Sequence, residues 1–152
     1  MKHFMNLFKN LAKERNELVM KHAHGRLLDI GCGKENYIAH HRNNSFGIDK
    51  DDDFCFHVNS FDTISMVASF NYMTREEQSN YLTFSRAMLK DSGKLIITCV
   101  TPLGARLKAR DGETERGIKR ADLVDRVEKH GFTCIYVKPF NFHMNNLFVF
   151  IK

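Results

Sequence analysis

The segment from Leu27 to Gly33 (LLDIGCG) contains the residues that are best suited to hold a ligand. A short apolar run ends at two glycines, Gly31 and Gly33, and a helical pattern follows. Glycines at a turn from strand to helix let the backbone approach a ligand closely, next to the N–H groups of a helix N-terminus. Two glycines alone are weak evidence, so a cofactor loop here needs a second supporting feature.

Asp49 supplies that second feature. It ends the next apolar run (SFGID), 20 residues after Asp29. This spacing is expected of an acidic residue that holds a ribose, because the two hydroxyls of a ribose suit the two oxygens of one carboxylate. Together the two segments predict a site for a cofactor that contains a nucleoside.

The hydrophobic pattern predicts the elements that position these residues. Apolar residues at helical spacing, with lysines and glutamates between them, predict an amphipathic helix up to about Met20. Further helices are expected at 34–42, 74–90 and 121–130, and strands at 26–30, 45–49, 54–58, 61–70, 94–100, 132–137 and 147–151. The polar segment 101–119 is expected to form a loop with room for a helical turn.

Two local signals define the helix at 74–90. Thr74 and Glu77 form a capping-box pattern, in which each side chain accepts a hydrogen bond from the other residue's backbone N–H. Asp91-Ser92-Gly93 is expected to stop the helix, because Gly93 can adopt a positive φ.

The order of the elements predicts the topology. Early strands alternate with helices, which favours a parallel sheet, and the last two strands have no helix between them, so they should pair antiparallel. The expected fold class is α/β, with a mostly parallel central sheet, an antiparallel closing strand and helices on both faces. The 152 residues suit a single domain, with 1–22 as a lid or cap helix and 26–152 as the cofactor-binding core.

In these segments the sequence resembles the class I S-adenosylmethionine-dependent methyltransferases. LLDIGCG is similar to their first motif, FGID to their second, FDTISMVASFNYM to their fourth strand, and AMLKDSGKLIIT to the passage from a helix into their fifth strand. The resemblance covers about residues 26–101 directly, and the two closing strands also fit the family. It implies a Rossmann-like methyltransferase fold that uses S-adenosylmethionine and releases S-adenosylhomocysteine.

The resemblance also implies roles for the residues of the glycine loop. Asp29, Gly31 and Gly33 would surround the methionine part of the cofactor, and Cys32 would place a small apolar side chain inside the same loop. Asp49 would hold the ribose hydroxyls.

Other implied contacts lie further along the chain. Lys50 would lie beside the adenine, and Asn59 and Ser60, where the third strand is expected to end, would contact its amino group. Ser69, at the end of the fourth strand, would lie close to the transferable methyl group. Arg15 in the leading helix is a candidate for the methionine carboxylate.

The sequence departs from the family in two places. The usual third glycine is absent from Gly33-Lys34-Glu35-Asn36, which predicts a bulkier loop. Only a few residues separate 54–58 from Phe61, so the fold is expected to be reduced after the third strand, with one sheet face thinly covered. The N-terminal helix or a second subunit could cover that face, which leaves a homodimer open.

The charge and the cysteine content indicate which partners and which cellular compartment to expect. The net charge is +5, and residues 1–26 contribute +4 of it through six Lys and Arg against two Glu. This basic helix is either a solvated face or a site that attracts a nucleic acid. The four cysteines are far apart and form no CxxC, so reduced thiols in a cytoplasmic protein are expected, without disulfides or a metal. No run of 18 apolar residues indicates a membrane span.

The function expected from these features is transfer of a methyl group from S-adenosylmethionine to an unidentified acceptor. In-line displacement needs alignment more than acid–base chemistry, so no catalytic residue is assigned, although Asn71, Tyr72 and His143 are candidates.

The segment Ser69-Phe-Asn-Tyr72 lacks both prolines of the amino-methylating DNA enzymes it partly resembles. The alternative is a non-catalytic cofactor-binding module or regulatory subunit, with or without nucleic acid. A dinucleotide-dependent oxidoreductase is disfavoured, because GxGxxG is absent and the closing strands are antiparallel.

Overall fold

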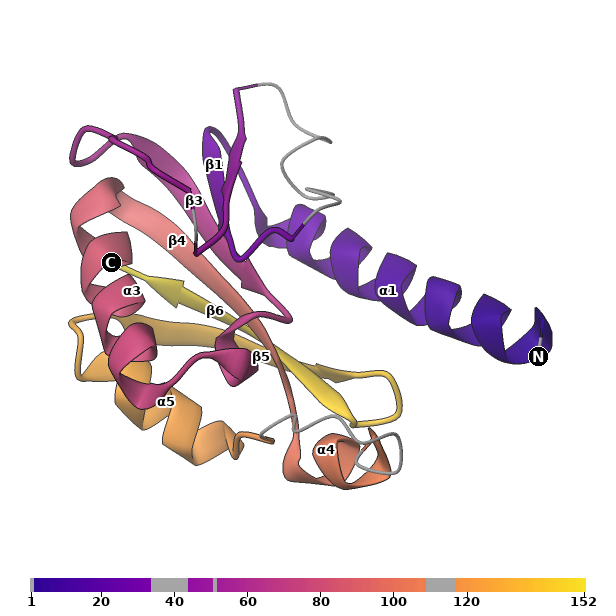
Figure 1. Cartoon of the computed structure of the whole chain (residues 1–152). Coiled ribbons are helices and arrows are strands. Elements are labelled where there is room, and N and C mark those ends of the chain that lie inside the picture. The colour runs from indigo at the N-terminus through magenta and orange to yellow at the C-terminus, as the bar shows by residue number, and fades with distance from the viewer. Residues whose placement is uncertain (1, 34–43, 51, 109–116) are drawn as a thin grey trace.

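The computed structural model describes residues 2–33, 44–50, 52–108 and 117–152. Within them, six strands form one sheet in the order β2-β1-β3-β4-β6-β5 (Figure 1). The strands are β1 (Leu27–Ile30), β2 (Phe46–Ile48), β3 (Phe61–Val67), β4 (Leu89–Val100), β5 (Thr133–Phe140) and β6 (Asn145–Ile151). The helix expected at 34–42 lies outside the described residues.

The pairing of the strands confirms the expected α/β class. β1, β2, β3 and β4 run parallel, and β6 pairs antiparallel with both β4 and β5. The parallel strands end at Ile30, Ile48, Val67 and Val100, which define the carboxyl edge of the sheet; the opposite edge is the amino edge. Ligands of open α/β sheets bind outside the carboxyl ends of the strands, so this edge is where a site is sought.

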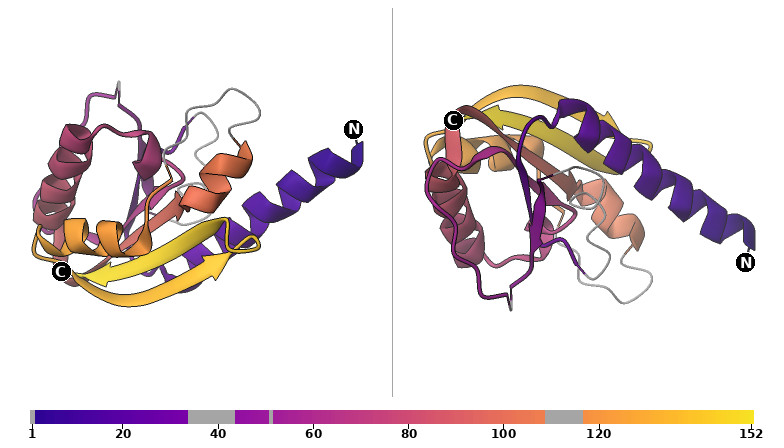
Figure 2. Two further views of the ribbon diagram at one scale, coloured as in Figure 1. Left: turned by 90° about the horizontal axis from the view of Figure 1, so that it is seen from below. Right: turned by 90° about the horizontal axis from the view of Figure 1, so that it is seen from above.

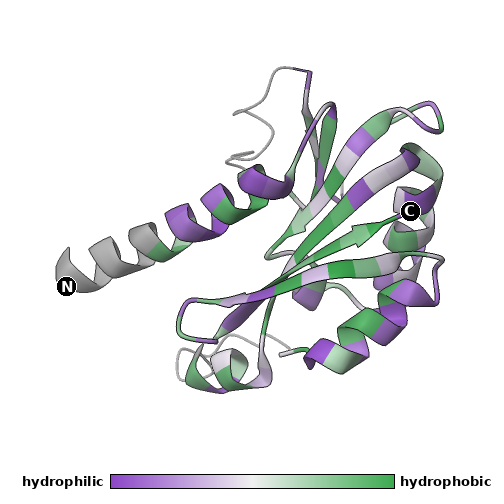
Figure 3. Ribbon diagram, turned by 180° about the vertical axis from the view of Figure 1, so that it is seen from behind, coloured by the Kyte–Doolittle hydropathy of each residue, from purple (hydrophilic) through white to green (hydrophobic). Residues whose placement is uncertain are grey.

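Helices cover both faces of the sheet (Figure 2). α3 (Arg75–Met88) and α5 (Arg120–Glu128) pack on one face, where Leu82 is fully buried among alternate strand residues. α1 (Lys2–His22) lies on the other face, where Val19 packs into a second apolar cluster, while its first half extends away from the sheet (Figure 1). Apolar residues concentrate on the central strands between these helices (Figure 3). No helix of the described residues has the length and apolar character needed to cross a membrane.

The strand expected at 54–58 is not formed. Only 12 residues, 49–60, lie between Ile48 at the end of β2 and Phe61 at the start of β3. Because β2 and β3 run in the same direction, this segment must return from the carboxyl edge to the amino edge, and no length remains for a strand as well. The segment instead packs aromatic rings onto the sheet: Phe56 lies 5.1 Å from the Phe61 ring and Phe54 lies 5.3 Å from the Phe84 ring of α3.

Because of these aromatic contacts, the sheet face beside β2 and β3 is better covered than the sequence predicted. Phe54 and Phe56 cover the region beside β2 and β3, and the guanidinium of Arg26 lies 4.9 Å from the Phe46 ring centre and 4.8 Å from that of Phe61. α1 does not cover this region, because it packs on the opposite face.

Two element boundaries differ from those expected from the sequence. The strand expected at 61–70 ends at Val67, because Ala68 has φ 54° and a short 3₁₀ helix, η1 (Phe70–Tyr72), follows. The segment 101–119, expected to be a loop with a helical turn, contains the seven-residue helix α4 (Pro102–Lys108).

The start of α3 agrees with the capping-box prediction, but its end does not. Thr74 Oγ1 accepts a hydrogen bond from the Glu77 backbone N–H, and a Glu77 carboxylate oxygen accepts one from Thr74 N–H. The helix ends at Met88 instead of Lys90, and the expected stop lies inside β4. The positive φ belongs to Ser92 (61°), whereas Gly93 is required for space, since a Cβ there would lie 2.8 Å from the Lys90 carbonyl oxygen.

Candidate functional site

The glycine loop lies at the carboxyl edge, tied to the end of β2. The backbone N–H groups of Gly31 and Cys32 both donate to the Ile48 carbonyl oxygen, at 2.8 Å and 3.2 Å. Gly31 has φ 73° and Gly33 has φ 62°, a conformation that side-chain-bearing residues rarely adopt. A Cβ on Gly31 would lie 2.5 Å from that of Ser69, whereas a Cβ on Gly33 would meet no described residue within 4 Å. Gly31 therefore packs against the loop after β3, and within the described part of the chain nothing packs against Gly33.

Asp29 is buried beneath this loop, on the face covered by α1. Its side chain is only 3% exposed, and its Oδ1 accepts a hydrogen bond from Ser65 Oγ at 2.6 Å. Burial raises the pKa of Asp29 to about 7, although the Ser65 hydrogen bond and the positive charge of Arg15 oppose the rise. Burial in turn lowers the pKa of Arg15, which the charge of Asp29 raises. Arg15 thus brings α1 close to the base of the glycine loop.

A hollow of about 340 Å³ opens beside the loop at the carboxyl edge. Residues from four segments line it, among them Gly31, Asp49, Lys50, Ser69, Tyr72 and Tyr81. The exposed Asp49 carboxylate follows β2, where one of its oxygens accepts a hydrogen bond from the Lys50 backbone N–H at 2.8 Å. Ser69 Oγ donates to the Ile30 carbonyl oxygen at 2.9 Å, which joins the loop after β3 to the end of β1. The hollow is a concave, partly polar surface of the size that small ligands occupy.

The pKa of the Cys32 thiol shows that three aspartates lie near the glycine loop. Burial raises its pKa to about 11, and the negative charges of Asp29, Asp49 and Asp52 raise it further. The thiol therefore stays protonated at neutral pH, which agrees with a packing role. All four cysteines are free thiols.

Two of the residues predicted to contact a cofactor lie elsewhere. Asn59 and Ser60 precede β3 at the amino edge, where their backbone N–H groups donate to the carbonyl oxygens of Ala87 and Met88. Asn59 Oδ1 also accepts a hydrogen bond from Lys152 Nζ at 2.9 Å. The structure does not bring this pair to the carboxyl edge with the other predicted residues, because the segment before them is the return crossover and not a strand.

In their place, α3 supplies residues that sequence reasoning missed. Glu77 and Tyr81 of α3, together with Met73 just before that helix, line the hollow that Gly31 also lines. Burial raises the pKa of Tyr81, and the carboxylates of Glu77 and Asp49 raise it further, so these groups lie near one another. Glu77 and Tyr81 are one helical turn apart, which the capping box could have indicated, but only the packing of α3 shows which way they face.

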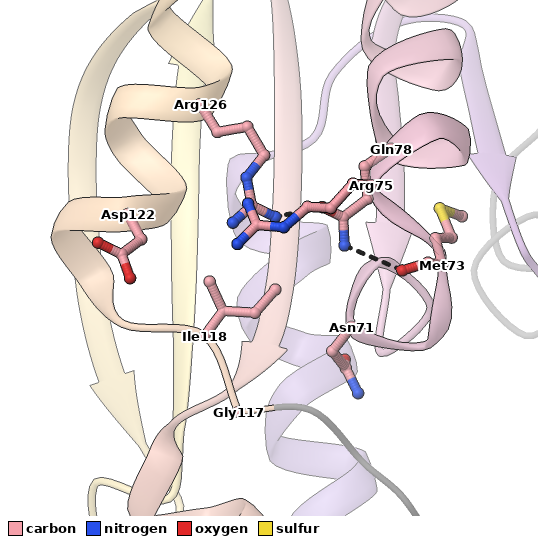
Figure 4. A pocket seen from close by; sticks show the side chains of 8 residues that line it. All are labelled: Asn71, Met73, Arg75, Gln78, Gly117, Ile118, Asp122 and Arg126. Atoms are coloured by element: carbon pink, nitrogen blue, oxygen red, sulfur yellow. Dashed lines mark hydrogen bonds between the residues drawn. The ribbon is translucent and has the colours of Figure 1, made fainter.

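A second hollow, of about 250 Å³, lies between η1, α3 and α5 (Figure 4). Asn71, Arg75, Gln78, Asp122 and Arg126 line it, and it shares Met73 with the first hollow. Of the three catalytic candidates, Tyr72 therefore lines the first hollow and Asn71 the second. His143 lies in the turn between β5 and β6 and lines neither.

Neither a protein-family model nor a curated protein sequence matches the chain. Solved structures do: an S-adenosylmethionine-dependent methyltransferase of Archaeoglobus fulgidus aligns over 94% of both chains, with a TM-score of 0.77 and 15% identity. This chain has a class I methyltransferase-like fold.

Two more structures with this methyltransferase-like fold have known ligands or partners. The 1,6-didemethyltoxoflavin N1-methyltransferase of Burkholderia thailandensis, solved with S-adenosylhomocysteine, covers 99% of this chain and 83% of its own, with a TM-score of 0.70 and 12% identity. A Haloferax volcanii methyltransferase solved in complex with the Trm112 activator covers 99% and 92%, with a TM-score of 0.69 and 10% identity. At these identities the similarity concerns the fold.

Proposed function

We propose that the protein is an S-adenosylmethionine-dependent methyltransferase. The observation that carries this proposal is the pairing, in one hollow at the carboxyl edge, of Gly31 from the glycine loop with Asp49 after β2. The methyltransferase-like fold supports it, since S-adenosylhomocysteine is bound in a structural neighbour.

The residues around the first hollow fit this cofactor. The Gly31–Gly33 loop would pass beside the methionine part, because Gly31 lines the hollow and no described residue fills the space of a Cβ at Gly33. Asp49 would accept hydrogen bonds from both ribose hydroxyls. Lys50, Met73 and Tyr81 would surround the adenine, in place of residues at the end of the strand that was expected at 54–58. Arg15, near Asp29, remains the candidate for the methionine carboxylate.

When bound, S-adenosylmethionine would supply an electrophilic methyl group: a lone pair of the acceptor would form the new bond to the methyl carbon while the methyl–sulfur bond breaks, and the thioether of S-adenosylhomocysteine would leave. The chain's own contribution is to hold the reactants in line and to exclude water. Ser69, fixed by its hydrogen bond to Ile30, and Tyr72 form the wall nearest the loop. An acceptor that is already nucleophilic needs no base from the protein.

Calorimetric titration of the whole chain with S-adenosylhomocysteine tests the proposal. We expect binding of S-adenosylhomocysteine and none of NAD. Asp49→Ala should weaken binding by about 1.5–3 kcal/mol, because a charge-assisted pair of hydrogen bonds is lost. Asp53→Ala is the matched control, since Asp53 is also exposed and acidic but does not line the hollow. Absence of S-adenosylhomocysteine binding, or equal losses in both variants, would contradict the assignment.

A role as a cofactor-binding subunit that requires a partner is the second candidate. It is favoured by the absence of a strand at 54–58, which leaves the adenine side of the hollow to Lys50, Met73 and Tyr81, and by the Trm112 complex of a structural neighbour. Binding of S-adenosylhomocysteine without methyl transfer to any member of a broad acceptor panel would support this second candidate.

A further inference from the structure

The second hollow, which we call the arginine chamber, adjoins the cofactor hollow without merging with it. Both contain Met73, and η1 separates them, with Tyr72 on one side and Asn71 on the other. Its far wall is held in place by a hydrogen bond from Ile118 N–H to the Val100 carbonyl oxygen at 2.9 Å. A molecule in the chamber would therefore lie next to the proposed site of methyl transfer.

Two arginines give the chamber a positive charge. Arg75 is exposed and makes no hydrogen bond or ion pair with a described residue, and Arg126 is half-buried on α5. Burial lowers the pKa of Arg126 and the charge of Arg75 lowers it further, so the two guanidinium groups lie close enough to repel (Figure 4). Asp122 opposes this effect but forms no salt bridge with either arginine within the described part of the chain.

Gln78 fixes one of these arginines. Its Oε1 accepts a hydrogen bond from Arg126 Nη1, and its Nε2 donates to the carbonyl oxygens of Phe70 and Met73, at 2.8 Å and 3.2 Å. Gln78 is buried, so this network orients the Arg126 guanidinium before any ligand binds. Arg75, which faces it from the first turn of α3, completes a pair of donors aimed at one space (Figure 4).

Asn71 is an independent sign that the chamber has a ligand. Its side chain is 2% exposed, yet among the described residues neither its amide nitrogen nor its amide oxygen has a hydrogen-bond partner. Buried polar groups in folded proteins are almost always paired, so an orphaned pair of atoms lining a hollow indicates a polar partner. The amide N–H groups can donate to the same oxygens that a guanidinium recognises.

We propose that the arginine chamber binds an oxyanion, a carboxylate or a phosphate, carried by the methyl acceptor. Arg75 and Arg126 pair with its oxygens, and the Asn71 amide donates to them. The link to the acceptor rests on the proposed methyltransferase function, whereas binding of the oxyanion depends only on the chamber. The acceptor would then be an acidic molecule that extends past Met73 towards the cofactor hollow.

Titration of the ¹⁵N-labelled chain with inorganic phosphate and, separately, with acetate tests this proposal. We expect saturable shifts of the side-chain N–H resonances of Arg75, Arg126 and Asn71, and the tighter of the two anions identifies the acidic group. Arg75→Gln should weaken binding at least about tenfold, because a charge-assisted hydrogen-bond donor is lost. Arg120→Gln is the matched control, since Arg120 is exposed on α5 outside the chamber, and it should leave the affinity unchanged.

The outcomes separate the chamber from the cofactor site. Binding of S-adenosylhomocysteine should be the same in Arg75→Gln and in the natural chain. Absence of saturable shifts with either anion, or equal weakening by Arg75→Gln and Arg120→Gln, would contradict anion binding in the arginine chamber, even if S-adenosylhomocysteine binds. Binding of an anion without S-adenosylhomocysteine would support the chamber and overturn its assignment to a methyl acceptor.

Discussion

Asp29 should make the stability of this protein depend on pH in an unusual direction. Its folded-state pKa is about 7, above the ordinary value of 3.8. A raised carboxyl pKa means that the folded state holds the proton more tightly than the unfolded state does. The stabilisation from this proton is therefore fully present below about pH 4 and is lost as the pH rises towards 7.

The size of the effect follows from the two pKa values. Linkage gives a loss of about 2 kcal/mol at pH 5 and about 4 kcal/mol at pH 8, relative to the fully protonated state. Asp29→Asn removes the titration while keeping an oxygen that accepts the Ser65 hydrogen bond. The free energy of unfolding of the variant, minus that of the natural chain, should therefore rise by about 2–3 kcal/mol from pH 5 to pH 8.

Urea unfolding followed by circular dichroism at the two pH values measures this difference. Asp53→Asn is the control for the loss of an acidic side chain, because Asp53 is exposed. A change with pH for Asp29→Asn that is no larger than the change for Asp53→Asn would refute the reasoning. So would a carbon NMR titration of the Asp29 carboxyl with a midpoint near 4.

Three further predictions concern the same region. Ser65→Ala should move the titration midpoint of Asp29 upward, because the hydrogen bond that favours the carboxylate is lost, and the carbon NMR titration would show it. Gly33→Ala should lower the free energy of unfolding by about 1 kcal/mol, because the positive φ there is strained for alanine. Gly31→Ala should lower it by more, because a Cβ at Gly31 would also meet Ser69. Equal losses for the two variants in urea unfolding would contradict the packing described for Gly31. Asn71→Leu should leave stability unchanged or raise it by about 1 kcal/mol, because it removes a buried amide that has no hydrogen-bond partner among the described residues. A loss of thermal stability would show that the amide has a partner elsewhere in the protein.

The sequence by itself determined the features that depend on neighbouring residues. The capping box of Thr74 and Glu77 forms as predicted, because its hydrogen bonds join residues within one helical turn. The glycine loop and Asp49 meet at one edge, since consecutive parallel strands end together and the spacing between the two motifs is that of one strand–helix–strand unit. Alternation of strands with helices was sufficient to predict the mostly parallel sheet.

The tertiary structure decided the features that depend on where distant segments meet. The phenylalanines of 54–58 suit a strand, but the direction of β3 requires a return crossover there, and this carries Asn59 and Ser60 to the amino edge. The proximity of Arg15 to Asp29 depends on how α1 lies across the sheet. The arginine chamber joins Arg75 of α3 to Arg126 of α5, 51 positions apart in the sequence, and only the packing of both helices on one face of the sheet brings their charges together.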